Sequence, residues 1–459
     1  ALPRGRVPLA SGNREQRGRR RGGAGLTDLH PPLSVALVTL GCPKNLVDSE
    51  CVASLLLESG FSLTEDPSAA DIIVLNTCGF IAPAKEEAIR AILEAADRKP
   101  PGGACRFVVV AGCLAQRYPD EILEEFPEVD AVVGTRGYAD IPWVIGCLSD
   151  AARKGGGVLP AADRIRHVPA GDSLAHLGAA RRPSTPVYAY LKVSEGCSNR
   201  CAYCAIPGIR GDHVSRPMDD LIAEAVRLAG IGTRELVLVA QDTTRYGLDL
   251  SGRRLLPDLV RRLAAIPGIL RIRLMYAYAD GVDDALIDLF RTEPKLARYL
   301  DLPIQHASDP ILGRMNRRDT RHSLEALLHR LRRDVPGIVL RTTVLVGFPG
   351  ETEQDMDVLL SFLRAIRFDR LGCFVFSPEE GTPAAAMEPK VPESVAESRY
   401  HRVMALQQAI SAASLRRRVG TVESVLIESV SDDGIFYLGR TSGEAPEIDL
   451  HEQALIANV

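Results

Sequence analysis

Short, apolar, β-branched runs alternate with amphipathic stretches along most of this chain. The first series of runs is SVALVTLG (34–41), DIIVLNT (71–77), RFVVVAG (106–112) and VDAVVGT (129–135). Such runs, bounded by Gly, Thr or Asn, are typical of buried strands, and the stretches between them have the period of helices. Because a β-α-β-α order produces a parallel sheet, we expect an N-terminal parallel α/β domain over 34–150.

A second series starts at Val187. Its six runs are VYAYLKVS (187–194), ELVLVAQ (235–241), IRLMYAY (272–278), YLDLPIQ (299–305), IVLRTTVLVG (338–347) and LGCFVFS (371–377). Eight strand-helix units close a full barrel, so six predict an open, partial (βα)6 barrel over 185–395. The Gly- and Pro-interrupted stretch 151–184 is predicted to be a linker.

The last part of the chain has a different pattern. Residues 396–418 are predicted to form an amphipathic connecting helix. From Val419 the runs VESVLIESV and GIFYLGR, with turn residues between them, predict a small all-β domain over 419–459.

Ten cysteines are more than the core of a 459-residue chain requires. The sequence has no signal-peptide pattern and no apolar run near the roughly 18 residues of a membrane span. We therefore expect a cytoplasmic protein with no membrane partner. Disulfides are rare in that compartment, so metal ligation or catalysis is the better explanation of the cysteines.

Charge is unevenly distributed. Residues 1–21 hold seven arginines and one acid, so the rest of the chain is more acidic than its net charge of −4 shows. The Arg/Gly-rich leader, 1–30, lacks apolar periodicity and is predicted to be disordered. Two interpretations stay open: a basic arm that touches nucleic acid, or an artefact of gene prediction.

Three cysteines directly follow the first strand of the second series. Cys197, Cys201 and Cys204 have the spacing C-x3-C-x2-C in EGCSNRCAYCAIP. Three thiolates can hold three irons of a [4Fe-4S] cubane and leave the fourth iron open for a cofactor. The alternative is a zinc site, which needs a fourth protein ligand, and His213 is the nearest candidate.

Three further cysteines, Cys42, Cys78 and Cys113, each follow a predicted strand of the first series. The carboxyl ends of parallel strands lie along one edge of a sheet, where such sheets bind ligands. We expect these thiols to converge into a second three-thiolate site; three unrelated buried thiols are the alternative. The other four cysteines are predicted to be structural, namely Cys51, Cys105, Cys147 and Cys373.

The C-x3-C-x2-C segment resembles the radical S-adenosylmethionine superfamily. The resemblance implies that the open iron binds S-adenosylmethionine and that one-electron reduction cleaves it to a 5′-deoxyadenosyl radical. It also implies that Tyr203 lies near the adenine, and that Gly347, in LVGFPGETE, places its backbone against the cofactor. A core tyrosine and a simple turn glycine are the alternatives.

Both triads, with the segments GCPKNLVDSE, NTCGFI, GCLAQR and GFPGETE, resemble the methylthiotransferase family from about residue 34 onward. The family implies two [4Fe-4S] clusters, S-adenosylmethionine both as methyl donor and as radical source, and an external one-electron reductant. The segments CPKN and CGFI match the branch that methylthiolates the β-carbon of an aspartate in the twelfth small-subunit ribosomal protein. The transfer-RNA branch has CQMN-like and CSVRE-like segments instead.

Two other functions remain open, a transfer-RNA adenosine methylthiotransferase and a non-catalytic iron–sulfur electron carrier. Carriers usually complete each cluster with four cysteines. Residues 419–459 hold eight acids and one base, which suits a basic ribosomal protein rather than phosphates, although a solvated acidic face is an alternative. We therefore do not expect nucleic acid as the substrate. We name no catalytic acid or base, because hydrogen-atom abstraction replaces the general base.

The segment GRTSGEAPEID resembles the TRAM domain of the same family. After Asp449 the chain departs from that pattern. We therefore expect the small β domain to be truncated by two strands or more, with an exposed strand edge.

Overall fold

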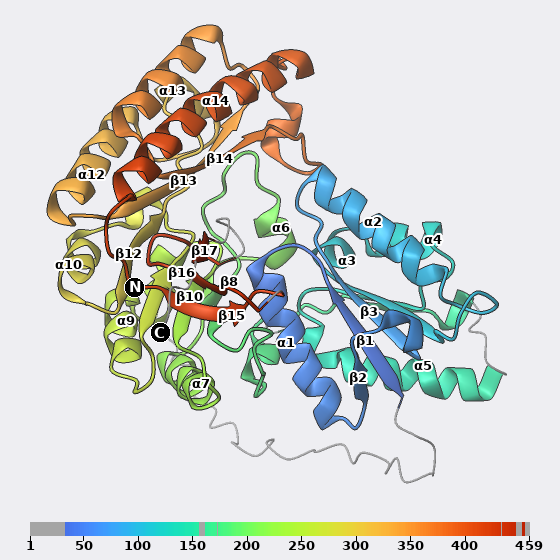
Figure 1. The fold of residues 1–459 in the computed structure, drawn as a ribbon. Coiled ribbons are helices and arrows are strands. Elements are labelled where there is room, and N and C mark those ends of the chain that lie inside the picture. Colours follow the sequence, from blue (N-terminus) through green and yellow to red (C-terminus); the bar gives the residue numbers. More distant parts are fainter. Residues whose placement is uncertain (1–32, 156–160, 172, 433, 447–451, 455–459) are drawn as a thin grey trace, which may run out of the picture. The chain divides into compact units, whose positions relative to one another are not determined.

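The computed structural model describes residues 33–155, 161–171, 173–432, 434–446 and 452–454. The chain divides into two units, Ala1–Pro32 and Leu33–Val459. The predicted leader, 1–30, lies outside the described residues. All of the described helices and strands belong to the second unit (Figure 1).

The N-terminal sheet has six parallel strands in the order β2-β1-β3-β4-β5-β6. Their bounds are β1 Ser34–Thr39, β2 Ser62–Thr64, β3 Ile72–Thr77, β4 Phe107–Gly112, β5 Ala131–Val133 and β6 Ile165–His167. The four predicted strands and their parallel arrangement are confirmed. Strands β2 and β6 were not predicted, because each has three residues, none fully buried, and no apolar run. Strand β6 lies inside the stretch 151–184 predicted to be a linker.

Helices cover both faces of this sheet. They are α1 Pro43–Glu58, α2 Ala82–Ala96, α3 Cys113–Arg117, α4 Pro119–Glu125 and α5 Ile141–Gly155. Apolar residues of α1 and α5 pack on one face, and those of α2 and α4 pack on the other. Burial on both faces explains why β3 and β4 are apolar without alternation.

The second sheet is the predicted six-stranded parallel sheet of an open partial barrel, in the order β14-β13-β12-β11-β10-β7. The strands are β7 Tyr188–Lys192, β10 Glu235–Val239, β11 Arg271–Leu274, β12 Leu296–Asp301, β13 Val339–Val346 and β14 Arg370–Val375. The helices are α6 Ile206–Arg210, α7 Met218–Gly230, α8 Leu248–Ser251, α9 Leu256–Ala264, α10 Asp284–Thr292, α11 Asp309–Arg314, α12 Arg321–Asp334, α13 Glu353–Ile366 and α14 Glu393–Arg418.

The two faces of the barrel sheet pack against different parts of the chain. Leu236 and Leu238 of β10 face the core formed with the barrel helices. Val237 and Val239 face the inner side, where Val47 of α1 and Ala445 complete a separate apolar cluster. The inner side of the barrel is thus covered by the N-terminal domain and by the C-terminal segment.

The C-terminal segment forms a small antiparallel sheet of β15 Leu426–Val430, β16 Tyr437–Arg440 and β17 Glu452–Ala454. Arg440 is fully buried and its guanidinium pairs with Glu235 at 3.0 Å, at the start of β10. A two-stranded ribbon, β8 Ser194–Glu195 with β9 Val214–Ser215, follows the first barrel strand. The small all-β region is confirmed, and its resemblance to a TRAM domain stays a prediction.

No helix among the described residues is both long and apolar enough to cross a membrane.

Candidate functional site

The structure places Cys42, Cys78 and Cys113 at one edge of the N-terminal sheet. Cys42 directly precedes α1, Cys78 follows β3, and Cys113 begins α3 directly after β4. Gly41 has a φ of +96°, and a Cβ added to it would lie 2.7 Å from Cys78 Cβ. The turns that carry Cys42 and Cys78 therefore pack so closely that only glycine fits between them.

The three thiols influence one another electrostatically. Burial raises the pKa of Cys78 to about 12, and the nearby Cys113 and Cys42 thiols add to that shift. Burial also raises the pKa of Cys113. At Cys42 burial is outweighed by the positive charges of Lys44 and Arg210 and by backbone N–H groups, so its pKa is lowered. Three neighbouring thiolates repel one another, and a bound cation relieves that repulsion. Such a group of thiols is therefore suited to binding a metal cluster.

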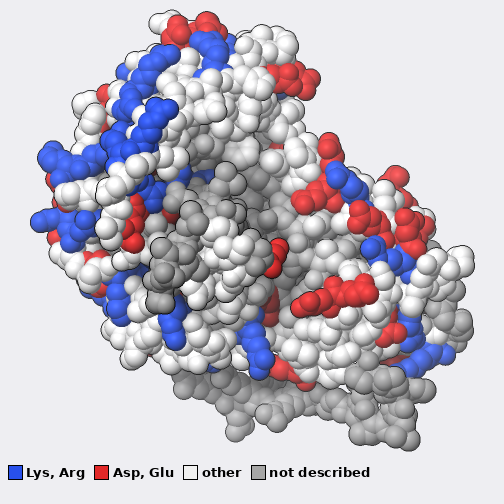
Figure 2. Space-filling model, viewed as in Figure 1, with Lys and Arg blue, Asp and Glu red and all other residues white. Residues whose placement is uncertain are grey.

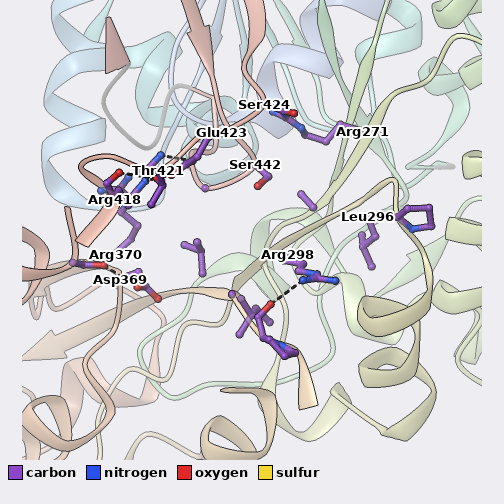
Figure 3. Close-up of a pocket in the computed structure, with 18 of the residues that line it drawn as sticks. Arg271, Leu296, Arg298, Asp369, Arg370, Arg418, Thr421, Glu423, Ser424 and Ser442 are labelled. Carbon is purple, nitrogen blue, oxygen red and sulfur yellow. Dashed lines mark hydrogen bonds and ion pairs between the residues drawn. The ribbon is translucent and has the colours of Figure 1, made fainter. Parts of the chain in front are cut away.

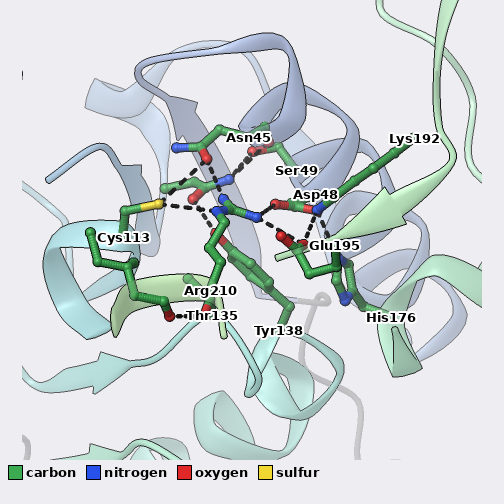
Figure 4. Close-up of polar contacts among 12 residues, drawn as sticks. Asn45, Asp48, Ser49, Cys113, Thr135, Tyr138, His176, Lys192, Glu195 and Arg210 are labelled. Atoms are coloured by element: carbon green, nitrogen blue, oxygen red, sulfur yellow. Dashed lines mark hydrogen bonds and ion pairs between the residues drawn. The ribbon is translucent and has the colours of Figure 1, made fainter. Parts of the chain in front are cut away.

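A buried polar network adjoins Cys113 (Figure 4). The guanidinium of Arg210, at the end of α6, donates to Cys113 Sγ at 3.3 Å through Nε. Its Nη1 donates to Asp48 at 3.0 Å and to Glu195 at 2.9 Å. Lys192 Nζ lies 2.6 Å from Asp48, and these cations hold the pKa of Asp48 well below its usual range against the opposing effect of burial. Each of these charges therefore has a partner of opposite sign.

This network joins the two domains, since Asp48 lies on α1 and Arg210 on α6. Sequence reasoning did not identify it. Asp48 and Lys192 lie inside predicted elements, and a charge within an element is usually on its solvent face. The available signal was the position of Arg210 only six residues after Cys204, in the loop that carries the second triad.

Cys197, Cys201 and Cys204 lie on the loop between β8 and α6. The Cys204 N–H donates to the Cys201 carbonyl at 3.0 Å, and Cys201 Sγ lies 3.5 Å from Tyr278 Oη. Burial raises the pKa of Cys204 to about 12, and Cys201 and Cys197 add to that shift. The three thiols are therefore neighbours on one loop, as the spacing predicts.

All six cysteines are free thiols. The described residues contain no set of three His, Cys, Asp or Glu side chains that could hold a single metal ion. His213, the candidate fourth zinc ligand, has its Nε2 3.1 Å from Ser215 Oγ. In a cubane each thiolate binds a separate iron, so two groups of three free thiols fit two [4Fe-4S] clusters.

Tyr203 and Gly347 lie in the barrel part of the site. Tyr203 is half-buried beside Met315 and Phe348, and burial raises its pKa well above the usual value. Gly347 directly follows β13 with a φ of +76°, and a Cβ there would lie 2.5 Å from Ala396 Cβ of α14. Helix packing alone thus explains this glycine, and both cofactor contacts stay predictions.

Several residues near the carboxyl ends of the barrel strands have left-handed backbone conformations without being glycine. Arg200 has a φ of +53°, Tyr276 of +58°, Gln305 of +68° and Asn316 of +56°. Such conformations cost about 1–3 kcal/mol each and persist where the surrounding structure determines them, often at functional sites. No glycine, asparagine-glycine or proline signal marks Tyr276 or Gln305 in the sequence.

A large cavity of about 1160 Å³ lies elsewhere, at the amino ends of β11 to β14 (Figure 3). Some of its basic side chains are paired with acids of the chain itself: Arg418 lies 2.7 Å from Glu423, and Arg370 lies 3.0 Å from Glu444. Barrel enzymes react at the opposite, carboxyl ends of their strands. The cysteine loops, and not this cavity, therefore remain the candidate site.

Two family models match the chain. The Radical SAM superfamily matches residues 191–363, and a family described as uncharacterized protein family UPF0004 matches residues 34–134. Each range contains one cysteine triad.

Curated relatives cover nearly the whole chain. The chain is 50% identical over 418 residues to the ribosomal protein uS12 methylthiotransferase RimO of Acetivibrio thermocellus, with 90% of each chain covered. It is 48% identical over 417 residues to the RimO proteins of Trichlorobacter lovleyi and Geobacter sulfurreducens, of which 90% and 91% are covered.

Solved structures share the fold at low sequence identity. The radical S-adenosylmethionine methyltransferase TsrM from Kitasatospora setae, solved with cobalamin and a [4Fe-4S] cluster, has a TM-score of 0.55 and 17% identity, over 77% of this chain and 74% of that chain. The cobalamin-dependent radical enzyme OxsB has a TM-score of 0.52 and 13% identity, over 88% and 62%. At these identities the likeness supports the fold alone.

Proposed function

We propose that this chain catalyses the reaction of its family. The chain belongs to the ribosomal protein uS12 methylthiotransferases named RimO. The chain is a radical S-adenosylmethionine enzyme that attaches a methylthio group to the β-carbon of an aspartate in ribosomal protein uS12. The observation that carries this proposal is the 50% identity over 90% of both chains. An alignment of that length overlaps both matched domains, each of which contains one cysteine triad.

Each triad has a separate task in the proposed reaction. Cys197, Cys201 and Cys204 would hold the cluster that binds S-adenosylmethionine, and Cys42, Cys78 and Cys113 would hold the auxiliary cluster. When bound, the first cluster supplies the electron that generates the radical, and the second supplies the site for the sulfur to be transferred. The electron comes from an external one-electron reductant.

A substrate carbon must reach both triads in the proposed reaction. The chain therefore has to hold the two triads in fixed positions. Arg210 contacts Cys113 and the barrel residue Glu195 at once. Glu379, in the loop after β14, accepts from Lys85 of α2 at 2.9 Å and from Arg117 of α3 at 2.8 Å. Such positioning is how a protein contributes to a reaction whose chemistry belongs to its cofactors.

The protein substrate is proposed from the family and not from the acidic C-terminal segment. Three of the acids in 419–459 pair with arginines of the chain itself: Glu423 and Glu444 with Arg418, and Glu428 with Arg440. Figure 2 shows Lys and Arg over the region of α12 and α14 and acids over the region of α2, so neither sign covers the whole visible face. We propose that the enzyme acts in the cytoplasm on uS12, with no membrane partner and with no nucleic acid as substrate.

Anaerobic reconstitution with iron and sulfide, followed by reaction with uS12, S-adenosylmethionine and a reductant, tests the proposal. Mass spectrometry should detect one added methylthio group on a single aspartate. A methylthio group on transfer RNA alone would instead assign the chain to the other branch of the family. Complete absence of 5′-deoxyadenosine would contradict an enzymatic function.

A further inference from the structure

Lys44 is a buried cation that forms no ion pair with an acidic side chain among the described residues. It lies in the first turn of α1, two residues after Cys42, and is 9% exposed. Its ammonium lies 3.2 Å from the centroid of the Tyr276 ring. Among the described residues, no oxygen accepts a hydrogen bond or forms an ion pair with this ammonium. A cation–π contact thus takes the place of an ion pair here, while Asp301 and Glu195, with which the ammonium forms no ion pair, also attract it.

The neighbouring buried cations are bound differently. Lys192 and Arg210 pair with Asp48, and Arg181 pairs with Glu50 and Glu224. A buried charge is costly unless it is paired, and a cation–π contact offsets only part of that cost. An anionic group of a ligand would therefore supply the ion pair that the Lys44 ammonium does not form within the described residues.

Tyr276 is fixed in a strained conformation beneath that ammonium. Its φ is +58°. Its N–H donates to the Asp301 carboxylate at 3.0 Å, and its carbonyl accepts the N–H of Thr243 at 3.1 Å. Asp301 is fully buried and is itself held by Arg341 at 2.6 Å. Hydrogen bonds at both its N–H and its carbonyl hold Tyr276 in this strained backbone conformation, which places its ring against Lys44.

Each partner of the Lys44–Tyr276 pair adjoins a different triad along the chain. Lys44 is two residues from Cys42, and Tyr276 is two residues from Tyr278, whose Oη is 3.5 Å from Cys201 Sγ. One partner belongs to the domain of the auxiliary triad and the other to the partial barrel. A group bound at this pair is therefore near both sets of thiols.

We propose that Lys44, supported by Tyr276, binds the side-chain carboxylate of the substrate aspartate. The β-carbon is bonded directly to that carboxyl carbon, so an ion pair with Lys44 would hold the reacting carbon between the two triads. The inference rests on the proposed function, which supplies an aspartate as the reacting residue. A charge-assisted hydrogen bond would make Lys44 the residue that distinguishes aspartate from asparagine.

The test uses two uS12 peptides that differ only in aspartate or asparagine at the reacting position. Their dissociation constants are measured on the reconstituted enzyme with S-adenosylmethionine but without reductant. The wild type should bind the aspartate peptide about 10- to 100-fold more tightly, the range for a hydrogen bond to a charged group. In Lys44→Met this preference should fall to about 3-fold or less, and Lys44→Arg should restore part of it. The exposed Lys390→Met serves as the matched control and should keep the full preference.

Two outcomes would overturn the inference. Lys44→Met could weaken the binding of both peptides equally. It could also change the electron paramagnetic resonance spectrum of the auxiliary cluster while the preference for the aspartate peptide stays intact. Either result would assign Lys44 to the cluster and not to the substrate. Iron content confirms that each variant is loaded. If the preference is present but the reductant yields no methylthio product, the proposed function fails and the carboxylate subsite stands.

Discussion

Cys78 and Cys201 belong to triads with different proposed tasks, so substituting them one at a time separates the two halves of the reaction. Cys201→Ala should abolish 5′-deoxyadenosine formation, because the cluster that delivers the electron loses one of its three thiolates. Cys78→Ala should leave that cleavage in place and stop methylthio transfer. Chromatography of 5′-deoxyadenosine and mass spectrometry of uS12 measure the two products.

The control for this pair is Cys147→Ala on α5, a half-buried thiol that belongs to neither triad. It should leave both products near the wild-type level. If Cys78→Ala lost both products to the same extent, the two triads would not act separately.

His306 provides a pH-dependent contribution to stability. Its ring is fully buried, Nδ1 accepts the N–H of Ser308 at 2.9 Å, and Nε2 has no hydrogen-bond partner among the described residues. Burial lowers the pKa of His306 from 6.5 to about 4, with Asp355 opposing the shift. Between these two values the unfolded chain binds a proton that the folded chain does not, so the folded state loses stability as the pH falls.

The free energy of unfolding should therefore drop by roughly 2 kcal/mol from this residue between pH 7.5 and pH 5. His306→Asn removes the titrating group. The difference between wild type and variant, measured by denaturant unfolding at both pH values, should shrink by that amount at pH 5. An unchanged difference would mean that the imidazole takes up a proton equally in both states.

At the scale of elements, the turns that end β1, β3 and β4 position the first triad. Gly41→Ala would place a Cβ 2.7 Å from Cys78 Cβ at a φ of +96°. The two turns would be forced apart, and the auxiliary cluster should be lost while the cluster on the barrel loop remains. Iron content of the reconstituted protein should fall by about half, since one of two equal clusters is lost.

Gly60→Ala is the matched control for that substitution. Gly60 also has a left-handed φ, +89°, but no atom lies within 4 Å of a Cβ built on it. It should cost about 1–2 kcal/mol of stability through backbone strain and leave the iron content unchanged. Equal iron loss in both variants would show that the conformation of the turn, and not its contact with Cys78, is what matters.

The elements that were predictable are those whose residues are buried on both faces. The runs ending at Thr77 and Gly112 are fully buried strands, and parallel pairing alone dictated that Cys78 and Cys113 would lie at one edge. The edge strands β2 and β6 were not predicted, because a half-buried strand of three residues has no distinctive pattern. The left-handed Tyr276 was also not predictable, since its conformation depends on Asp301, 25 residues away.

At the scale of the whole molecule, contacts between domains complete the site, and sequence patterns do not reveal them. Arg210 contacts Asp48 across 162 positions and Cys113 across 97. Periodicity describes one element at a time and cannot pair residues on separate domains. The sequence therefore predicts which thiols form each triad, while the polar groups that bring the triads together are visible only in the structure.

Glu379 offers a test of whether those contacts control the reaction. Its carboxylate is 2% exposed and accepts from Lys85 and Arg117 of the N-terminal domain. Glu379→Gln would leave both cations without their anion and should destabilise the protein by about 1–3 kcal/mol. Because the loop after β14 would hold the N-terminal domain less firmly, the substrate radical should meet the sulfur less often.

The expected result is a rise in the ratio of 5′-deoxyadenosine to methylthiolated uS12, with radical formation itself little changed. Asp120→Asn is the matched control, since Asp120 pairs with Arg166 inside the N-terminal domain with both side chains exposed, a type of pair that contributes at most about 1 kcal/mol. It should not alter the ratio. If Glu379→Gln lowered stability but left the ratio at the wild-type value, these contacts would stabilise the fold without governing how the radical reaches the sulfur.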